Sequence, residues 1–278
     1  MKTVLITGAS TGFGEAVARH FSQAGWNVIA TMRNPAAASP ELLASKGVVV
    51  SRLDVQDKKS IDDAIAQGVA QFGQIDVVVN NAGYGLFGIF EGIQRDAIQS
   101  QFDVNVFGPM DVVRAILPHF RAKQAGTIVN VSSGAGAIGF PMASVYSSSK
   151  FALEGWSEGL SYELGSLGIK VKIVEPGGAM KTNFMARVGG ESGSQQQIPD
   201  YGPFLGHIGQ MYAGMGSNAD ADAVEKVVAS IFAAATDGTD QLRYTPTNDI
   251  QPILKARRST SEQDYRAFTL SIFMPSKA

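Results

Sequence analysis

The apolar positions of the chain fall into short runs that alternate with stretches of helical spacing. Seven runs predict strands, and several of them, such as Val48-Val49-Val50 and Val77-Val78-Val79, are apolar at every position. Uninterrupted runs of this kind are typical of strands that are buried on both faces, as in a parallel sheet covered by helices. The predicted strands span residues 2–7, 26–31, 47–53, 75–80, 126–131, 169–174 and 242–245.

Helical patterns lie between these strands, at residues 12–24, 57–72, 94–123, 144–167 and 219–235. In the first of them Val17, Phe21 and Ala24 recur at helical spacing, and Gly25 follows as a stop signal. The strand–helix–strand order implies a doubly wound, mostly parallel sheet with helices on both faces. Because no repeat or linker divides the chain, we expect a single α/β domain over residues 1–278 with a seven-stranded sheet.

The regular alternation breaks between Lys181 and Asn218. The first half of this segment is rich in Gly, Ser and Gln, which favours a flexible loop, whereas the second half is rich in aromatic residues and Met, which favour burial. The segment is either a surface loop with a short packed helix or, as we favour, a lid over a substrate, because long irregular loops in compact domains are often lids. Residues 246–278 form a C-terminal extension beyond the last predicted strand.

Composition excludes several classes of protein. The 278 residues include 23 Lys and Arg against 25 Asp and Glu, a net charge of -2 that argues against nucleic-acid binding. The absence of cysteine excludes disulfides, thiolate metal sites and cysteine nucleophiles. No apolar run approaches the ~18 residues of a membrane-spanning helix, and the first apolar run is too short for a signal peptide. We therefore expect a soluble cytoplasmic protein without a membrane span.

A glycine-rich turn, Thr7-Gly8-Ala9-Ser10-Thr11-Gly12-Phe13-Gly14, follows the first predicted strand and precedes the first helix. Gly8 permits the sharp turn, Gly12 lets backbone approach a pyrophosphate, and Gly14 lets the helix pack closely on the strand. The helix N-terminus offers free N–H groups and a positive dipole to the anion. The strand before the turn and the helix after it favour a dinucleotide site over an empty turn.

The end of the second predicted strand indicates which dinucleotide is bound. Proteins that bind NAD place a carboxylate there for the ribose hydroxyls, but this chain has no acidic residue between Asn27 and Pro40 and instead has Arg33. A guanidinium group binds a 2′-phosphate that a carboxylate would repel. We therefore expect NADP(H) rather than NAD(H), and the alternative is that Arg33 is an ordinary solvated loop residue.

Tyr146 and Lys150 lie four residues apart in a predicted helix and therefore share one of its faces. A nearby ammonium group favours the phenolate and lowers the pKa of the phenol, which makes it a better acid–base catalyst. Ser132 and Ser133 end the fifth predicted strand, where ligands bind in doubly wound sheets, so either hydroxyl could donate to a carbonyl oxygen. The histidines, His20, His119 and His207, have no metal-ligand spacing, and we expect no metal.

Together these motifs resemble those of the short-chain dehydrogenase/reductase family, in the branch that combines G-x-x-x-G-x-G with Y-x-x-x-K, and within it the hydroxysteroid and retinol dehydrogenase-like group. The resemblance covers roughly residues 3–185 and implies a Rossmann fold. It also rests on Asp54-Val55, Asn80-Asn81-Ala82-Gly83, Asn105 and Pro176-Gly177, and the spacing of thirteen residues to Tyr146 matches Ser133 to the family serine.

The resemblance implies that Asn105, Ser133, Tyr146 and Lys150 are the catalytic residues. It implies that the cofactor is bound by Gly8, Ser10, Thr11, Gly12, Phe13, Gly14, Arg33, Asp54, Val55, Asn81, Ala82, Gly83, Tyr146, Lys150, Pro176, Gly177, Ala179 and Thr182. The family often has threonine five positions after the proline, whereas here Lys181 stands at that position and Thr182 follows it, which implies a shifted loop.

The activity implied by the resemblance is hydride transfer between NADPH and the carbonyl group of a lipophilic small molecule. Tyr146 would give its proton to the oxygen, Ser133 would polarise the carbonyl, Lys150 would hold the ribose and lower the pKa of Tyr146, and Asn105 would support a water chain that returns the proton. Assembly as a homodimer or homotetramer through residues 94–123 and 144–167 is implied as well. The alternative is a non-catalytic NADP(H)-binding regulator, against which the intact serine, tyrosine and lysine argue.

Overall fold

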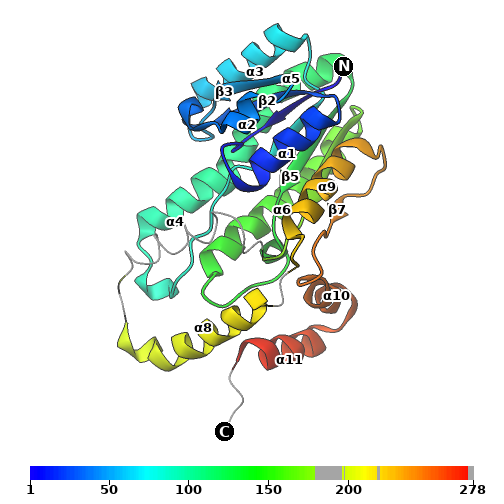
Figure 1. The fold of residues 1–278 in the computed structure, drawn as a ribbon. Coiled ribbons are helices and arrows are strands. Elements are labelled where there is room, and N and C mark those ends of the chain that lie inside the picture. Colours follow the sequence, from blue (N-terminus) through cyan, green and yellow to red (C-terminus); the bar gives the residue numbers. More distant parts are fainter. Residues whose placement is uncertain (179–195, 197, 218–219, 275–278) are drawn as a thin grey trace.

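The computed structural model describes residues 1–178, 196, 198–217 and 220–274. Its centre is a seven-stranded sheet in the order β3-β2-β1-β4-β5-β6-β7, and every neighbouring pair is parallel (Figure 1). The predicted parallel sheet is therefore confirmed. The strands are β1 (Thr3–Ile6), β2 (Asn27–Met32), β3 (Val48–Arg52), β4 (Val77–Asn80), β5 (Gly126–Val131), β6 (Ile169–Val174) and β7 (Arg243–Tyr244).

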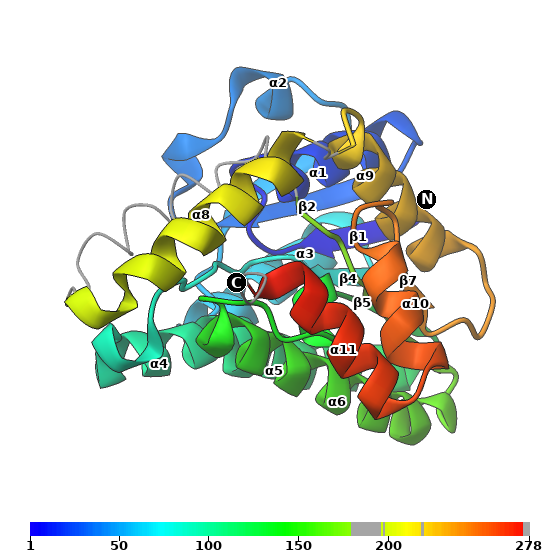
Figure 2. The same cartoon turned by 90° about the horizontal axis from the view of Figure 1, so that it is seen from below.

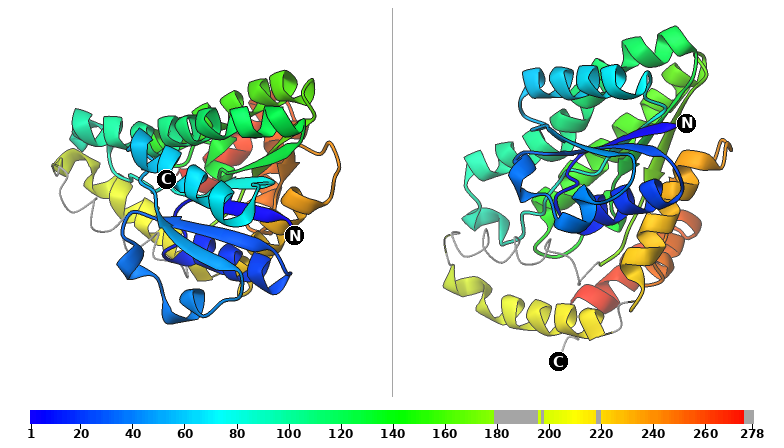
Figure 3. Two further views of the ribbon diagram at one scale, coloured as in Figure 1. Left: turned by 90° about the horizontal axis from the view of Figure 1, so that it is seen from above. Right: turned by 45° about the horizontal axis from the view of Figure 1, so that its top comes forward.

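Helices cover both faces of the sheet, as predicted (Figure 3). On one face, α1 (Gly12–Gln23) and α9 (Ala223–Thr236) bury Phe21 and Ile231 in one core cluster. On the other face, α3 (Lys58–Phe72), α5 (Gly108–Lys123) and α6 (Ser144–Gly165) bury Ile61, Ile116 and Leu164 in a second cluster. Each face of the sheet thus has its own apolar core, which explains why the strands are apolar on both sides.

The predicted helix over residues 94–123 is present, and it contains a π-helical turn that the prediction does not include. It consists of α4 (Arg95–Phe102), a π-helical turn at Asp103–Phe107 and α5, which continues through Pro118. A π-helical turn adds one residue to the helix and re-aims the side chains around it, and such turns are frequent at functional sites. Sequence periodicity did not indicate this interruption.

Helices outside the predicted pattern gather beyond the carboxyl ends of the strands. They are α8 (Gly202–Ser217), α10 (Gln251–Ser259) and α11 (Glu262–Phe273), and Figures 1 and 2 show α8 and α11 crossing that end of the molecule. A short α2 (Pro40–Leu43) follows β2. The second half of the predicted irregular segment is therefore a regular helix, whereas residues 181–195, 197 and 218 lie outside the described residues.

The C-terminal extension packs as part of the molecule. Its apolar side chains form a cluster with Ile138, which follows β5. They are Ile250, the N-cap residue of α10, Ile253 and Leu254 within α10, and Phe273 in α11. At Gly134 a Cβ atom would overlap Ile250, so backbone and extension are in close contact there. The extension therefore forms one wall above the carboxyl edge of the sheet.

Candidate active site

A cavity of about 410 Å³ opens at the carboxyl edge of the sheet. It lies where the strand order reverses between β1 and β4, which is the usual ligand site of doubly wound sheets. Most of the residues predicted from the sequence line it. They are Gly8, Ser10, Thr11, Gly12, Phe13, Arg33, Asp54, Val55, Asn81, Ala82, Gly83, Ser133, Tyr146, Lys150, Pro176 and Gly177.

Two predicted residues among the described ones, Gly14 and Asn105, do not line this cavity. Gly14 lies beneath the turn, where a Cβ atom would overlap the carbonyl oxygen of Gly8. Asn105 lies behind Gly83, with its Oδ1 atom 3.1 Å from the position that a Cβ atom of Gly83 would occupy. Ala179 and Thr182 lie outside the described residues, so their roles stay predictions.

The glycine-rich turn has the backbone conformation that its sequence predicts. Gly8 and Gly12 have φ values of +69° and +61°, in the left-handed region that L side chains rarely adopt. A Cβ atom on Gly8 would also lie 2.9 Å from the Cα atom of Ala82. Asn81 Nδ2 donates hydrogen bonds to the carbonyl oxygens of Thr7 and Gly8 at 3.0 and 3.1 Å, which fixes the turn against β4.

The N-terminus of α1 fits a pyrophosphate group. Its N-cap residue, Thr11, makes no side-chain hydrogen bond to the first turn of the helix, so the N–H groups there are not capped by that side chain. Uncapped N–H groups and the helix dipole together form an anion site. Because Ser10, Thr11, Gly12 and Phe13 all line the cavity, this anion site faces into it.

Arg33 follows β2, is exposed and lines the same cavity. No hydrogen bond or ion pair joins its guanidinium group to another described residue. Asp54, the predicted adenine-binding residue, also lines the cavity, and its Oδ1 atom accepts a hydrogen bond from the N–H group of Gln56 at 3.1 Å. The adenosine end of the cavity therefore presents one cationic side chain and one carboxylate that is engaged in a local turn.

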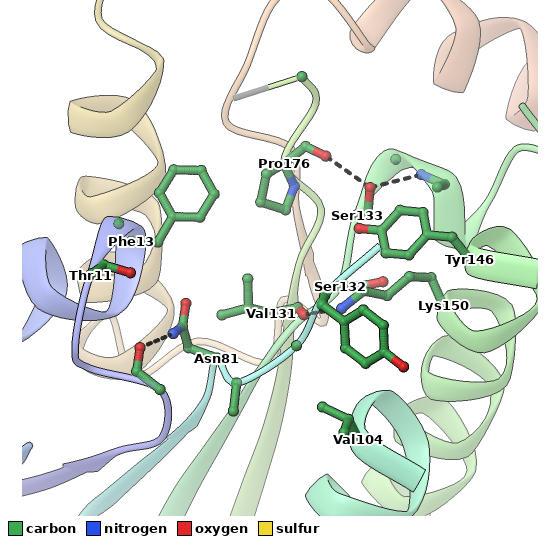
Figure 4. A pocket seen from close by; sticks show the side chains of 18 of the residues that line it. Thr11, Phe13, Asn81, Val104, Val131, Ser132, Ser133, Tyr146, Lys150 and Pro176 are labelled. Carbon is green, nitrogen blue, oxygen red and sulfur yellow. Dashed lines mark hydrogen bonds between the residues drawn. The ribbon is translucent and has the colours of Figure 1, made fainter. Parts of the chain in front are cut away.

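Tyr146 lies at the other end of the cavity, buried and turned toward Ser133 (Figure 4). Burial raises the pKa of the Tyr146 phenol to about 12, and a hydrogen bond with Ser133 acts in the opposite direction. Lys150 Nζ lies 5.9 Å from the centroid of the Tyr146 ring. Burial is the larger of these two effects, and Lys150 is not among the causes of the change in the pKa of Tyr146. At neutral pH the phenol is protonated.

Ser133 is held by backbone groups on both sides. Its Oγ atom accepts a hydrogen bond from the N–H group of Ala135 at 3.1 Å and donates to the carbonyl oxygen of Pro176 at 3.5 Å (Figure 4). Ser132, the alternative from the sequence, also lines the cavity, but its buried Oγ atom makes no hydrogen bond of normal geometry in the described structure and interacts with Glu154 rather than with Tyr146. The geometry therefore favours Ser133 as the hydroxyl that acts with Tyr146.

Lys150 is buried beside Tyr146, and its Nζ atom donates to the carbonyl oxygen of Val131 at 2.9 Å. Burial lowers the pKa of Lys150 to about 8, and the charge of Glu154 opposes that change. Asn105, in the π-helical turn, accepts from the N–H group of Tyr84 at 3.1 Å and donates to the carbonyl oxygen of Tyr84 and to Ser149 Oγ. The amide of Asn105 thus connects the loop after β4 to the helix that carries Tyr146 and Lys150.

Sequence reasoning missed the wall of the cavity beyond Tyr146. The wall is mostly apolar, and its members come from the loop after β4, the segment between β5 and α6, helix α8 and the C-terminal extension. They include Tyr84, Phe87, Phe140, Ala143, Tyr212 and Ile250, together with Asp249. The ring of Phe87 stacks on that of Tyr146 with centroids 5.5 Å apart. Only tertiary packing brings these segments together, so the one available signal was the aromatic content near residue 212.

The histidines do not form a metal site in the described residues, which contain no cluster of three or more His, Cys, Asp or Glu side chains with that geometry. His20 contacts the ring of Phe232, and His119 Nε2 bonds with backbone of Ile75. His207 is absent from the residues that line the cavity.

Comparison with known proteins places this arrangement in a family. The family model for short chain dehydrogenases matches residues 2–192. An uncharacterised oxidoreductase of Schizosaccharomyces pombe is 37% identical over 78% of this chain and 89% of its own length. The 17-beta-hydroxysteroid dehydrogenase type 1 of Mus musculus is 33% identical over 91% of this chain and 76% of its own.

Solved structures agree with this comparison. A short-chain dehydrogenase from Streptomyces avermitilis superposes with a TM-score of 0.81 at 35% identity, over 97% of this chain and 94% of its own. A 3-ketoacyl-(acyl-carrier-protein) reductase from Brucella melitensis in complex with NADH has a TM-score of 0.63 at 28% identity, over 66% and 78%. ElxO with bound NADP has a TM-score of 0.68 at 27% identity, over 88% and 97%.

The chain therefore belongs to the short-chain dehydrogenase/reductase family of oxidoreductases. Its structural relatives bind NAD(H) or NADP(H), and the glycine-rich turn and uncapped α1 N-terminus fit such a dinucleotide. Among the helices of the described residues, none is long and apolar enough to cross a lipid bilayer.

Proposed function

We propose that this protein is an NADP(H)-dependent oxidoreductase that interconverts a lipophilic ketone or aldehyde and its alcohol, with carbonyl reduction as the main direction. The observation that carries the proposal is the buried pair of Tyr146 and Ser133, which faces a mostly apolar cavity wall. A buried phenol that is protonated at neutral pH can deliver a proton to a carbonyl oxygen that has no access to water.

Ser133 and Tyr146 bind the two sides of one carbonyl oxygen. The N–H group of Ala135 holds the Ser133 oxygen in place at 3.1 Å, and the Ser133 O–H group, whose contact with the Pro176 carbonyl oxygen is long at 3.5 Å, turns to donate to the substrate oxygen. Preorganised donors of this kind stabilise the charge that develops on oxygen in the transition state. The nicotinamide cofactor supplies the hydride in reduction and accepts it in oxidation. Tyr146 gives its proton to the oxygen in reduction and takes it back in oxidation.

Lys150 and Asn105 support Tyr146 from behind. Lys150 brings a positive charge near the phenol, which stabilises the phenolate that forms after proton transfer. Asn105 forms hydrogen bonds with the backbone of Tyr84 and the hydroxyl of Ser149. It therefore keeps the loop after β4 at a fixed position relative to α6, the helix that carries Tyr146 and Lys150. Since Asn105 is buried behind Gly83, we assign it a role in proton return rather than in substrate contact.

The proposed cofactor site follows the cavity from end to end. The turn at Gly8–Gly14 and the α1 N-terminus hold the pyrophosphate, Asp54 and Val55 flank the adenine, and Asn81 to Gly83 and Pro176-Gly177 lie along the nicotinamide half. Ala179 and Thr182 are the further residues proposed to bind the nicotinamide half of the cofactor. The exposed guanidinium group of Arg33 selects the 2′-phosphate of NADP(H), because no carboxylate follows β2 to bind the ribose hydroxyls instead.

The proposed substrate is a lipophilic molecule because the cavity wall offers it apolar contacts. Phe87, Phe140, Ala143 and Ile250 line the space near Tyr146. The hydroxyl of Tyr212, which also lines the cavity, donates to the carbonyl oxygen of Pro141 at 2.9 Å, so the ring rather than the hydroxyl is presented. Residues 181–218 would cover this space as a lid.

We propose further that the protein acts in the cytoplasm as a homodimer or homotetramer. Exposed aromatic side chains gather on the elements that family members use for association: Phe107 in the π-helical turn, and Phe151 and Tyr162 on α6. Burying them against a second copy would remove apolar surface from water. Light scattering after gel filtration tests this assembly, and a monomer at micromolar concentration would contradict it.

The test of the activity is a screen of ketones and aldehydes, followed by the decrease in NADPH absorbance, with Tyr146→Phe as the blank. We expect turnover in the wild type and a decrease of at least about 10²-fold in Tyr146→Phe, the scale of one general acid. Cofactor binding, measured by fluorescence, should survive the substitution. Binding without turnover for any carbonyl compound would instead favour the regulator.

The cofactor preference is tested by comparing kcat/KM for NADPH and NADH in the wild type and in Arg33→Ala. We expect the wild type to prefer NADPH and the substitution to reduce that preference by about 10-fold or more, the scale of one charge-assisted contact to phosphate. Lys46→Ala, which removes an exposed cation after α2, is the matched control. A wild type that prefers NADH would overturn the assignment.

A further inference from the structure

A group of charged side chains connects α6, the helix that carries Lys150, to the end of the sheet and to the C-terminal extension. Glu154 and Glu158 come from α6, Glu175 follows β6, Arg243 begins β7, and Arg258 comes from α10. Figures 1 and 2 show α10 next to β7, at the edge of the sheet. These residues, which we call the rear charge cluster, are not used by the reaction described above.

Arg243 is the centre of the rear charge cluster. Its Nε atom lies 2.9 Å from Glu154 Oε2, its Nη2 atom 2.5 Å from Glu158 Oε2, and its Nε atom 3.8 Å from Glu175 Oε1. Glu175 is fully buried, pairs with Arg258 and accepts a hydrogen bond from Thr245 Oγ1 at 3.0 Å. The cluster therefore ties the last strand and the C-terminal extension to the helix that carries Tyr146 and Lys150.

The charges of the rear charge cluster do not balance within it. Three carboxylates face two guanidinium groups, and two of the carboxylates, Glu154 and Glu175, are buried. Burial raises the pKa of Glu154, Glu175 raises it further, and Ser132 and Arg243 lower it. The second oxygen of Glu154, Oε1, is buried without a hydrogen-bond partner of normal geometry in the described structure. An unbalanced buried carboxylate is costly unless another cation lies close by.

Lys150 is the one Lys or Arg residue of α6, and it lies one helical turn before Glu154 on the same face of the helix. The groups near Lys150 Nζ are the ring of Tyr146 on its own helix and the neutral carbonyl oxygen of Val131 on β5, and Gly83 after β4 lies close to it as well. Of the charged groups near it, Glu154 is the one that favours the ammonium form and opposes the effect of burial.

We propose that Glu154 is a positioning residue that keeps Lys150 in its charged form, with Arg243, Glu175 and Arg258 holding Glu154 in place. This inference rests on the proposed role of Lys150 in the reaction. The C-terminal extension, through Arg258, would then contribute to the electrostatics of the reaction centre as well as to the wall of the cavity.

The direct test is the titration of Lys150 followed by NMR, in protein labelled with ¹³C at lysine Cε. The signal of Lys150 is the one that is missing from Lys150→Met. In the wild type we expect its midpoint near pH 8. In Glu154→Gln the midpoint should fall by about one unit or more, which is the usual effect of losing an adjacent opposite charge. Glu154→Asp, which keeps the charge, should restore most of the difference.

Glu158→Gln is the matched control, because Glu158 lies on the same helix and pairs with the same arginine but is one turn farther from Lys150. A purely structural effect of loosening Arg243 would shift Lys150 equally in Glu154→Gln and Glu158→Gln. We expect a shift below about 0.3 units for the control. An unshifted Lys150 in Glu154→Gln, or equal shifts in both variants, would overturn the proposal.

The interaction between Lys150 and Glu154 can also be measured by titrating Glu154 instead of Lys150. This second measurement tests the inference even where Glu154→Gln does not fold. An interaction between two groups is mutual, so Lys150→Met should raise the pKa of Glu154, followed by ¹³C at glutamate Cδ, by the same amount. No change at Glu154 would refute the coupling.

These NMR titrations need no turnover. A wild type that reduces no carbonyl compound would therefore refute the proposed function while leaving this inference to be decided. Where turnover is found, the pH profile of kcat supplies a further readout, because the limb that belongs to Lys150 should move in the same direction in Glu154→Gln.

Discussion

Lys150 should cost the protein stability, and replacing it by methionine should make the fold more stable while abolishing activity. Methionine has a similar length and no charge, and it suits the apolar surroundings of a buried side chain. Burial lowers the pKa of Lys150 from 10.5 to about 8. Because one pKa unit corresponds to about 1.4 kcal/mol, holding this ammonium ion in the folded state costs about 3 kcal/mol at pH 7, with the attraction of Glu154 already included.

The sign of the pH dependence follows from the direction of this change. Between pH 8 and 10.5 the unfolded chain binds more protons at this lysine than the folded chain does, so stability rises with pH across that window. The cost of Lys150 should therefore be about 3 kcal/mol at pH 7 and about 2 kcal/mol at pH 9. Above pH 10 the buried phenol of Tyr146, whose pKa is raised to about 12, acts in the opposite direction.

The assay is urea unfolding of the wild type and Lys150→Met at pH 7 and pH 9, at matched protein concentration. We expect the variant to be more stable at both values and the difference to shrink at pH 9. Lys46→Met, at an exposed position, should change the free energy of unfolding by less than about 0.5 kcal/mol. A variant that is no more stable than the wild type at pH 7, or a difference that is equal at the two pH values, would refute the reasoning.

Three further predictions concern the cavity. Gly8→Ala should weaken cofactor binding by at least about 10-fold, as measured by fluorescence titration. The reason is that φ of Gly8 is +69° and the new Cβ atom would lie 2.9 Å from Ala82 Cα. An unchanged affinity would contradict this reasoning. Ile250→Ala should raise KM for bulky apolar ketones by about 10-fold and leave cofactor affinity unchanged, because it removes apolar contact from the cavity wall. An unaltered KM would exclude Ile250 from the substrate site. Exhaustive chelation should leave kcat/KM unchanged, and a loss restored by added metal would show a metal requirement.

The sheet could be predicted from the sequence because its apolar runs report burial on both faces. Strands β5 and β6 have the bounds that their patterns predict, and the others differ by one or two residues at an end. The glycine-rich turn could also be predicted from the sequence. The positive φ of Gly8 favours glycine, and at Gly14 a Cβ atom would overlap the carbonyl oxygen of Gly8. These are local requirements, and local requirements are visible in local sequence.

The rest of the site depends on contacts between distant segments. Phe140, Tyr212 and Ile250 come together at the cavity only through tertiary packing, and no spacing along the chain predicts this proximity. The π-helical turn at Asn105 is also hidden, because one extra residue barely disturbs the apolar periodicity of a long helix. The raised pKa of Tyr146 is hidden as well, because the spacing to Lys150 indicates that the two side chains are close but not that burial removes solvation from the phenol.

The segment at Pro176–Gly178 has a consequence for the order in which the molecule is completed. Two of its N–H groups donate to side chains about 70 positions later in the chain, Gly177 to Thr247 Oγ1 at 2.8 Å and Gly178 to Asp249 Oδ2 at 2.7 Å. During synthesis the glycine turn and the sheet up to β6 can assemble well before those partners leave the ribosome. The nascent chain should therefore complete the glycine-rich turn first, and the cavity wall at Pro176–Gly178 should become fixed only when about the last tenth of the sequence has been made.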